Sequence, residues 1–298
     1  MAKRVISGWL SVLALASLAF NVSGCASKEA KFTYTKLDGE EAYALTRVEG
    51  AATEISVPST YEGLPVTKIE EGAFWNCTKL EKLTLPASIT TIEGGAVNGV
   101  DTLEELHVEN LVDWCAIEYE GMNGSGAAAA TFALYEGETL VETIDGSEDR
   151  FDVLAEKELG YKLDQNTFCG CTSLKEITLW DSITQIEGFA FMNCASLEKF
   201  FSNGSVSTYG LYFVNCPVLK TVNLKGIKST GNSGIFSECA ALEAIVFPDT
   251  LTSFYSNVAT DCPALKKMTF YSWNDNIQTN TDVFKSNNPS VEIEKIIA

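Results

Sequence analysis

The sequence predicts a repeat solenoid of short parallel β-strands, with a repeat period of 22–23 residues and one long insertion. Three observations support this fold class: cysteines recur at an almost constant spacing, a leucine follows each of them by three residues, and alternating apolar residues follow each leucine. The cysteines are Cys77, Cys171, Cys194, Cys216, Cys239 and Cys262. A single copy cannot bury both of its apolar faces. Stacked copies bury a continuous core, with strands of neighbouring turns about 4.8 Å apart.

The segment 1–24 has the features of a secretory signal peptide. Lys3 and Arg4 precede an apolar stretch that is shorter than the roughly 20 residues of a membrane-spanning helix. The small residues ahead of Cys25 resemble the lipobox of bacterial lipoproteins, in which the signal is cut before the cysteine and the thiol is lipidated. We therefore expect Cys25 to be lipidated and residues 25–31 to form a short tether. The alternative is an ordinary secretory signal with a chance cysteine.

The charge of the chain excludes some classes of partner. Asp and Glu number 40 against 21 Lys and Arg, which gives a net charge of −19, and loss of the signal peptide makes the chain more acidic still. No block rich in Lys and Arg offers a surface for phosphates, so nucleic acid is not an expected partner. Anionic headgroups repel an acidic surface, so we expect contact with a membrane only through the lipid on Cys25.

The first copies of the repeat occupy residues 69–108, after a segment, 32–68, that we expect to form an N-terminal cap. In the first copy, Phe74 stands three residues before Cys77 and Leu80 stands three residues after it. An alternating strand segment and a second apolar pair follow. Together these features resemble a repeat of the BspA-type leucine-rich repeat family.

The resemblance to this family covers about residues 43–108 and 163–275. It implies a leucine-rich repeat fold in a surface-exposed bacterial protein whose relatives are associated with adhesion to host proteins or to other cells. The later copies depart from the family pattern, because residues 231–234 and 256–259 replace the usual Gly-x-Ala-Phe sequence.

Between residues 109 and 162 the repeat frame is lost for more than two periods. The tripeptide 113–115, Asp-Trp-Cys, resembles an element of the longer repeats in the same family, and the Ala-rich middle of the insertion has the composition of a flexible tip. We expect Trp114 and Ile117 to pack the insertion onto the solenoid. Residues 139–144 are expected to add one further turn.

The repeats resume over residues 163–273, and residues 274–298 are expected to form a C-terminal cap. Alternation along each strand assigns every second residue to an outer face, and exposed aromatic side chains on such a face are typical of interfaces. The predicted ligand-binding residues are Trp180, Phe201, Tyr271, Lys199 and Thr178. Two alternatives stay open: Trp180 and Phe201 cover each other across adjacent turns, or Phe201 turns inward at a bulge.

We interpret the cysteine ladder as a column of buried free thiols. Residues at one repeat position point the same way, so their Cβ vectors do not converge as a disulfide or a tetrahedral metal site requires. Cys169 lies outside the ladder and is predicted to be an exposed thiol. An acidic cluster lacks the spacing of a calcium loop, so we expect it to be solvated and expect neither a metal nor a cofactor. Its members are Asp145, Glu148, Asp149, Asp152 and Glu156.

No residue is predicted to be catalytic. His107, the single histidine, is expected on the outward side of a strand with no nucleophile near it. The alternative is a surface glycan hydrolase that uses Glu105 and Glu176, which requires that the insertion add no more than one strand between them. We favour a non-catalytic, membrane-anchored protein of the bacterial cell surface that binds a host or neighbouring-cell protein or glycan.

Overall fold

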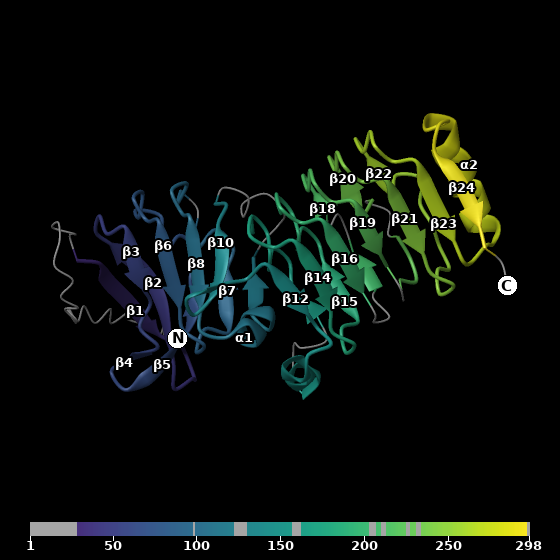
Figure 1. The fold of residues 1–298 in the computed structure, drawn as a ribbon. Coiled ribbons are helices and arrows are strands. Elements are labelled where there is room, and N and C mark those ends of the chain that lie inside the picture. Colours follow the sequence, from purple (N-terminus) through teal and green to yellow (C-terminus); the bar gives the residue numbers. More distant parts are fainter. Residues whose placement is uncertain are drawn as a thin grey trace, which may run out of the picture.

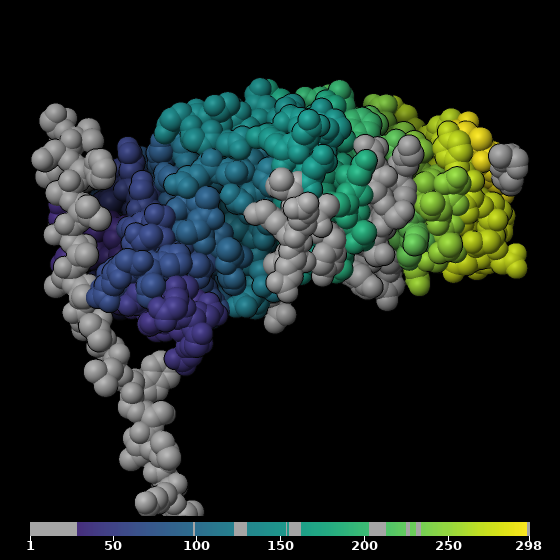
Figure 2. Space-filling model, turned by 90° about the horizontal axis from the view of Figure 1, so that it is seen from below, coloured from purple at the N-terminus to yellow at the C-terminus, as the bar shows by residue number. Residues whose placement is uncertain are grey.

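The computed structural model describes residues 29–97, 99–121, 130–156, 162–202, 207–209, 213–224, 227–230 and 234–296. They form an elongated parallel β-solenoid in which the chain advances turn by turn from one end to the other (Figure 1), so the predicted fold class is confirmed. Figure 2 shows the same progression along one long axis. Within this part of the chain, no helix is long and apolar enough to cross a membrane. The predicted signal peptide and Cys25 lie outside the described residues.

The N-terminal turns build two sheets. One has the order β1-β2-β5-β7-β9, with β4 paired to β5. Its strands are β1 (Lys31–Lys36), β2 (Tyr43–Glu49), β4 (Thr60–Tyr61), β5 (Leu64–Ile69), β7 (Thr91–Glu93) and β9 (Glu118–Glu120). The other sheet has the order β11-β10-β8-β6-β3. Its strands are β3 (Glu54–Ser56), β6 (Lys82–Leu85), β8 (Glu105–Val108), β10 (Ala133–Glu136) and β11 (Thr139–Leu140).

The C-terminal turns continue with a sheet of seven strands in the order β12-β14-β16-β19-β21-β23-β24, all paired in parallel. Its strands are β12 (Thr143–Asp145), β14 (Glu176–Leu179), β16 (Lys199–Ser202), β19 (Thr221–Asn223), β21 (Ala244–Phe247), β23 (Lys267–Phe270) and β24 (Glu292–Lys295). Two short sheets complete these turns. They contain β13 (Lys162–Leu163), β15 (Gln185–Glu187) and β17 (Ser207–Tyr209), and β18 (Phe213–Val214), β20 (Phe236–Ser237) and β22 (Ala259–Thr260).

The insertion contains more β-strands than the sequence predicted. It begins with α1 (Leu111–Cys115) and also contains the 3-10 helix η1 (Asp149–Glu156). Its strand β10 extends the N-terminal sheet beside β8, whereas its strand β12 opens the C-terminal sheet beside β14. Its strand β9 also pairs in parallel with β7, so the expectation of one further turn is corrected to three parallel strands, β9, β10 and β12, that belong to three different sheets. The Ala-rich segment 122–129 lies outside the described residues.

Trp114 and Ile117 pack the insertion onto the solenoid, as predicted, because both are buried members of the continuous hydrophobic core. The helix α1 begins at Asn110, whose side-chain oxygen accepts a hydrogen bond from the backbone N–H of Val112. This short helix thereby directs Trp114 and Cys115 inward.

A column of aromatic rings runs through the C-terminal core at the position three residues before Cys171, Cys194, Cys216 and Cys239. The rings of Phe168, Phe191, Phe213 and Phe236 stack in sequence, with centroid separations of 5.7, 5.3 and 5.4 Å. Each ring is almost completely buried. Stacked rings of this kind stabilise a core beyond the area that they bury, so each copy of the repeat fixes the position of the next.

The residue just before each of the last five ladder cysteines turns the chain with a positive φ. Gly170, Asn193, Asn215, Glu238 and Asp261 have φ values of 77°, 60°, 54°, 56° and 51°. Glycine and asparagine adopt this left-handed region readily, which explains why they stand at this position in the earlier copies.

The segment after β23 covers the last turn of the solenoid. The helix α2 (Asp275–Asn287) begins at Asn274, whose side chain accepts a hydrogen bond from the backbone N–H of Ile277 at 3.0 Å. Ile277 and Phe284 join the hydrophobic core, and β24 pairs in parallel with β23. The apolar edge of the final repeat is therefore covered by a helix and a strand.

Candidate binding face

The outward side of the C-terminal sheet is the candidate binding face, and we call it the strand face. It consists of the side chains that alternate with the core residues of β14, β16, β19, β21 and β23. These side chains are Glu176, Thr178, Lys199, Phe201, Thr221, Asn223, Ala244, Val246, Lys267 and Thr269. They form two rows, because parallel pairing places equivalent residues of successive turns in register.

Phe201 lies in the row that also contains Thr178, Asn223, Val246 and Thr269, and it is partly exposed. It is in register with Thr178 on one side and Asn223 on the other, and no bulge interrupts the pairing. Its neighbour Phe200 points inward, is fully buried, and makes an edge-to-face contact with Phe213 at a centroid separation of 4.9 Å. Of the alternatives left open by the sequence, an inward Phe201 at a bulge is therefore excluded.

Ion pairs neutralise the charges at both ends of the strand face. The ammonium group of Lys199 lies 3.0 Å from a carboxylate oxygen of Glu176. At the other end Lys267 lies 2.9 Å from Glu294, which also accepts a hydrogen bond from the Thr269 hydroxyl at 2.9 Å. The hydrogen bond from Lys267 lowers the pKa of the Glu294 carboxyl below its ordinary value.

Between these pairs the face carries no formal charge. The residues of this neutral strip are Thr178, Phe201, Thr221, Asn223, Ala244 and Val246. Since three of them are apolar, the strip combines an apolar centre with polar neighbours.

A line of alternating charges borders the strip on the side where the strands begin. Here lysine and glutamate alternate from turn to turn and pair across the strands: Lys175 with Glu142, Lys220 with Glu198 at 2.9 Å, and Lys266 with Glu243 at 3.4 Å. The hydrogen bond from Lys220 lowers the pKa of Glu198. These exposed pairs add little stability, but they leave the border polar with its charges already matched.

The prediction that Trp180 is an exposed member of this face is wrong. Its side chain is 2 % exposed and stacks on Phe151 of the insertion, with ring centroids 5.7 Å apart and planes within 6°. The strand β14 ends at Leu179, so the alternation no longer holds at Trp180, and the 3-10 helix of the insertion covers the ring. A Cβ on Gly146 would lie 2.3 Å from the Trp180 backbone nitrogen, which shows how closely the insertion approaches.

The structure brings Thr178, Lys199 and Phe201 together on β14 and β16. Tyr271 is 46 % exposed but follows β23, three strands from β16, which corresponds to about 14 Å at the spacing of a sheet. Val246 was not among the predicted binding residues, although the same alternation places it in the row of Phe201. Sequence reasoning gave weight to aromatic residues and therefore missed it.

His107 is buried, contrary to the expected position on the surface. It is 3 % exposed, its Nδ1 lies 2.6 Å from the carbonyl oxygen of Gly137, and its Nε2 lies 2.9 Å from a carboxylate oxygen of Glu105. The ring stacks on Tyr135 of β10 at a centroid separation of 4.4 Å. The hairpin of β10 and β11, which belongs to the insertion, folds over the histidine and removes it from solvent.

Cys169 is also buried, although the sequence predicted an exposed thiol. The residue is 5 % exposed, and burial raises the pKa of its thiol to about 12. All eight cysteines in the described ranges are free thiols, and five of the six ladder cysteines are buried, as predicted, whereas Cys262 is partly exposed. Within the same ranges no group of three or more His, Cys, Asp or Glu side chains could hold a metal ion.

The geometry required by the glycan hydrolase alternative is absent. Glu105 stands on β8 and Glu176 on β14, and the insertion places β10 beside the first and β12 beside the second. Glu105 and Glu176 therefore belong to different sheets, and the insertion adds β10, β11 and β12 after β8, more than the single strand that the alternative allowed. Each carboxylate is also engaged, Glu105 with His107 and Glu176 with Lys199.

Comparison with known proteins identifies the repeat. The family described as BspA type Leucine rich repeat region matches residues 43–116 and 161–290 in six copies. No curated protein matches the chain. Among solved structures, a leucine-rich repeat protein of T. pallidum is 19% identical with a TM-score of 0.34, and the match covers 90% of this chain and 97% of that chain.

Two further solved structures are similar to this chain. A leucine-rich cell surface protein of Faecalibacterium prausnitzii A2-165 is 16% identical, with a TM-score of 0.35 and coverage of 94% of this chain and 96% of that one. A leucine-rich repeat protein of Bacteroides ovatus ATCC 8483 is 18% identical, with a TM-score of 0.47, and the match covers 89% of this chain and 75% of that chain. Because the family match spans more than half of its residues, this chain belongs to the BspA-type leucine-rich repeat family.

Proposed function

We propose that this protein is a non-catalytic binding protein of the bacterial cell surface and that its strand face binds a partner protein. The observation that carries the proposal is the neutral strip around Phe201 and Val246, which lies between the ion pairs Glu176–Lys199 and Lys267–Glu294. Interfaces between proteins commonly have an apolar centre and a polar rim. The strip and its charged border have this arrangement.

A protein is a better partner for this strip than a glycan. A sugar is held by several polar groups arranged around its hydroxyls, but Lys199 and Glu176 already bond to each other, as do Lys267 and Glu294. Phe201 supplies one partly exposed ring, and Ala244 and Val246, both on β21 two turns further along, add a small aliphatic surface. Apolar side chains of a protein would match this chemistry and displace water from it.

Display at the cell surface rests on the sequence ahead of the solenoid. The residues before Cys25 have the pattern of a lipoprotein signal, and membership of the BspA-type family is consistent with surface exposure. Because acyl chains bind a bilayer by burying methylene groups, a lipidated Cys25 would anchor the protein despite its acidic surface. Cells that express the full chain should carry it in the membrane fraction, and a Cys25→Ser variant should lose that association.

The binding proposal is tested with the full chain carrying Cys25→Ser, which lacks the lipid. Its binding to immobilised extracellular matrix proteins, and separately to cell-surface glycans, is measured by biolayer interferometry. We expect saturable binding to a protein and a loss of at least about tenfold in affinity for a Phe201→Ala/Val246→Ser variant, as expected when central interface residues are truncated.

Two controls locate the site. Trp75 is 63% exposed on the N-terminal turns and away from the strand face, so Trp75→Ala removes an exposed ring without touching the strip and should leave binding unchanged. Glu105→Gln removes a carboxylate of the hydrolase alternative on β8, outside the strand face, and should also preserve binding. Full binding by the Phe201→Ala/Val246→Ser variant, or binding to glycans alone, would overturn the proposal.

A further inference from the structure

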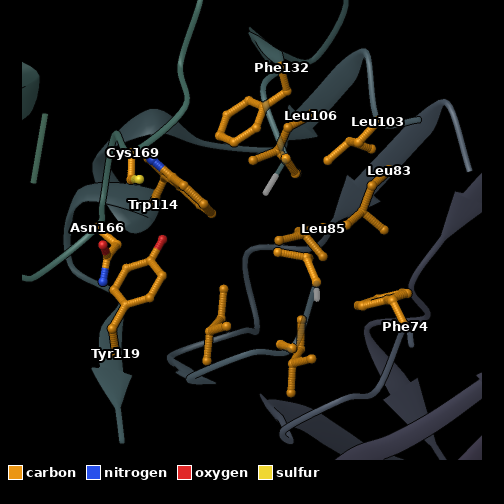
Figure 3. Close-up of a pocket in the computed structure, with 15 residues that line it drawn as sticks. Phe74, Leu83, Leu85, Leu103, Leu106, Trp114, Tyr119, Phe132, Asn166 and Cys169 are labelled. Atoms are coloured by element: carbon orange, nitrogen blue, oxygen red, sulfur yellow. The ribbon is translucent and has the colours of Figure 1, made fainter. Parts of the chain in front are cut away.

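A cavity of about 70 Å³ lies inside the solenoid where the repeat frame is broken. Figure 3 shows it between Leu83, Leu85 and Leu106 of the N-terminal turns and the aromatic side chains of Trp114 and Tyr119 from the insertion. The rest of its lining is also uncharged. The cavity is distinct from the strand face, which is formed by outward side chains of another sheet.

Two polar atoms of this lining are buried without a partner. Within the described part of the chain, the indole nitrogen Nε1 of Trp114 and the hydroxyl of Tyr119 have no hydrogen-bond partner, and the two residues are only 5% and 7% exposed. In Figure 3 the Tyr119 hydroxyl points toward Trp114 on the cavity side. A buried donor without an acceptor costs free energy, so a molecule that bonds to these groups would stabilise the folded protein.

The unpaired hydroxyl arises from a change in the repeat. In the sheet formed by β5, β7 and β9, Ile69 pairs with Ile92, and Ile92 pairs with Tyr119. The tyrosine thus occupies an inward position at which the preceding two turns carry isoleucine. Packing alone would favour another aliphatic residue there, whereas tyrosine brings a hydrogen-bonding group into the core.

The size and chemistry of the cavity define the ligand. A single water needs only about 10–15 Å³, and an apolar cavity of roughly 150 Å³ in another protein holds benzene, so this cavity fits a molecule of a few non-hydrogen atoms. Burial raises the pKa of Tyr119, which keeps the phenol neutral, and the lining contains no charged side chain. An ionic ligand would therefore meet no opposite charge.

We propose that the cavity is a binding site for a small neutral molecule with an aliphatic body and one oxygen, such as a short-chain alcohol. The oxygen hydrogen-bonds to the Tyr119 hydroxyl or to the Trp114 indole N–H. The aliphatic body contacts the leucine side chains on the opposite wall. The site lies beside Ala130 and Phe132, so the insertion supplies part of its wall as well as the Trp114 and Tyr119 groups, whereas Asn166 and Cys169 of the next repeat complete the lining.

The test uses isobutanol as the probe and the indole N–H signal of Trp114 as the readout. Tryptophan indole signals are resolved in a ¹⁵N–¹H correlation spectrum of the full chain, and a Trp114→Phe variant assigns the relevant one. We expect a saturable shift of the Trp114 signal on titration with isobutanol, while the signals of Trp75, Trp180 and Trp273 do not move.

Two variants separate cavity binding from a solvent effect. Ala96 lines the cavity, so Ala96→Leu fills it and should abolish the shift; Ala96→Val is the milder replacement if the larger side chain prevents folding. Tyr119→Phe keeps the ring and removes the hydroxyl, and should weaken binding about fivefold, the effect of one hydrogen bond. A shift that persists in the filled variants, or no shift in the unmodified protein, would overturn the proposal. So would a crystal structure in which ordered water alone bonds to Trp114 and Tyr119 in the presence of isobutanol.

Discussion

The thiol of Cys194 donates a hydrogen bond to the carbonyl oxygen of Phe168, one turn earlier in the solenoid, across 3.1 Å. In the same way, the Cys216 thiol donates to the carbonyl oxygen of Phe191 at 3.1 Å, and the Cys239 thiol donates to that of Phe213 at 3.4 Å. A thiol is a small apolar side chain with a weak donor. It fills the core and at the same time bonds to a carbonyl group of the preceding copy, which gives a physical reason for the cysteine ladder.

Replacing Cys194 should separate these two contributions. We expect Cys194→Ala to lower the free energy of unfolding by about 1–2 kcal/mol, because it removes both the sulfur contacts and the hydrogen bond to Phe168. Cys194→Ser retains a donor of similar size and should be less destabilising than alanine. Urea denaturation followed by circular dichroism measures both changes. A serine variant less stable than the alanine variant would show that the hydrogen bond is unimportant.

The reactivity of the thiols should follow their exposure. Burial raises the pKa of Cys169, and a hydrogen bond with Cys239 raises the pKa of Cys262 as well, so exposure decides their relative rates; Cys169 is buried, whereas Cys262 is the partly exposed member of the ladder. Iodoacetamide at pH 8 should modify Cys262 first and should reach Cys169 only after denaturation. Mass spectrometry of the digested protein reports the order. Modification of native Cys169 at the rate of Cys262 would contradict the burial of Cys169.

The repeat pattern predicts the fold well because its signal is local. Alternation along the strand that follows Leu80 places Leu83 and Leu85 inward, and they are 1 % and 4 % exposed in the structure. The same reasoning placed Phe201 outward and its outward position is confirmed. Each of these assignments depends only on neighbours in one strand and on stacking against an equivalent strand.

The wrong assignments share a different cause. Trp180 and His107 were predicted to face solvent, but Phe151 covers the first and the hairpin after Tyr135 covers the second. Both covering elements belong to the insertion, whose sequence does not follow the repeat. Where such a segment docks depends on tertiary contacts that periodicity does not encode. The unpaired hydroxyl of Tyr119 was missed for the same reason.

Trp180 should contribute to stability and not to ligand contact. Its ring is 2 % exposed and stacks on Phe151, so we expect Trp180→Ala to lower the free energy of unfolding by about 3–5 kcal/mol. Phe201→Ala removes a partly exposed ring and should cost about 1 kcal/mol or less. Guanidinium denaturation of the two variants makes the comparison. Equal, small effects would mean that the insertion does not pack on Trp180.

An ion-pair cluster on the N-terminal sheet should make part of the stability depend on pH. The ammonium group of Lys68 lies 2.7 Å from both Glu93 and Glu120, and these hydrogen bonds raise the pKa of Lys68. Burial pushes the pKa of Glu93 upward, but hydrogen bonds from Lys68 and from the backbone N–H of Glu71 outweigh it, so the pKa falls below the ordinary value of 4.5. A carboxyl group with a lowered pKa stabilises the folded state above its unfolded pKa and loses that contribution as the pH falls.

Lys68→Met tests this cluster, because it removes the ammonium group and keeps most of the aliphatic side chain. At pH 7 the variant should be less stable by about 1 kcal/mol, a value kept small because solvent screens partly exposed pairs. The difference should persist down to about pH 4.5 and shrink as the pH falls further, since Glu93 then becomes protonated in the folded protein as well. Melting temperatures between pH 3 and pH 7 measure the trend.

Lys36→Met is a matched control. Among the described residues Lys36 pairs with the exposed Glu41 at 3.3 Å, so this variant should show a smaller stability difference at every pH. A stability difference for Lys68→Met that grows on acidification would refute the sign derived from the Glu93 carboxyl.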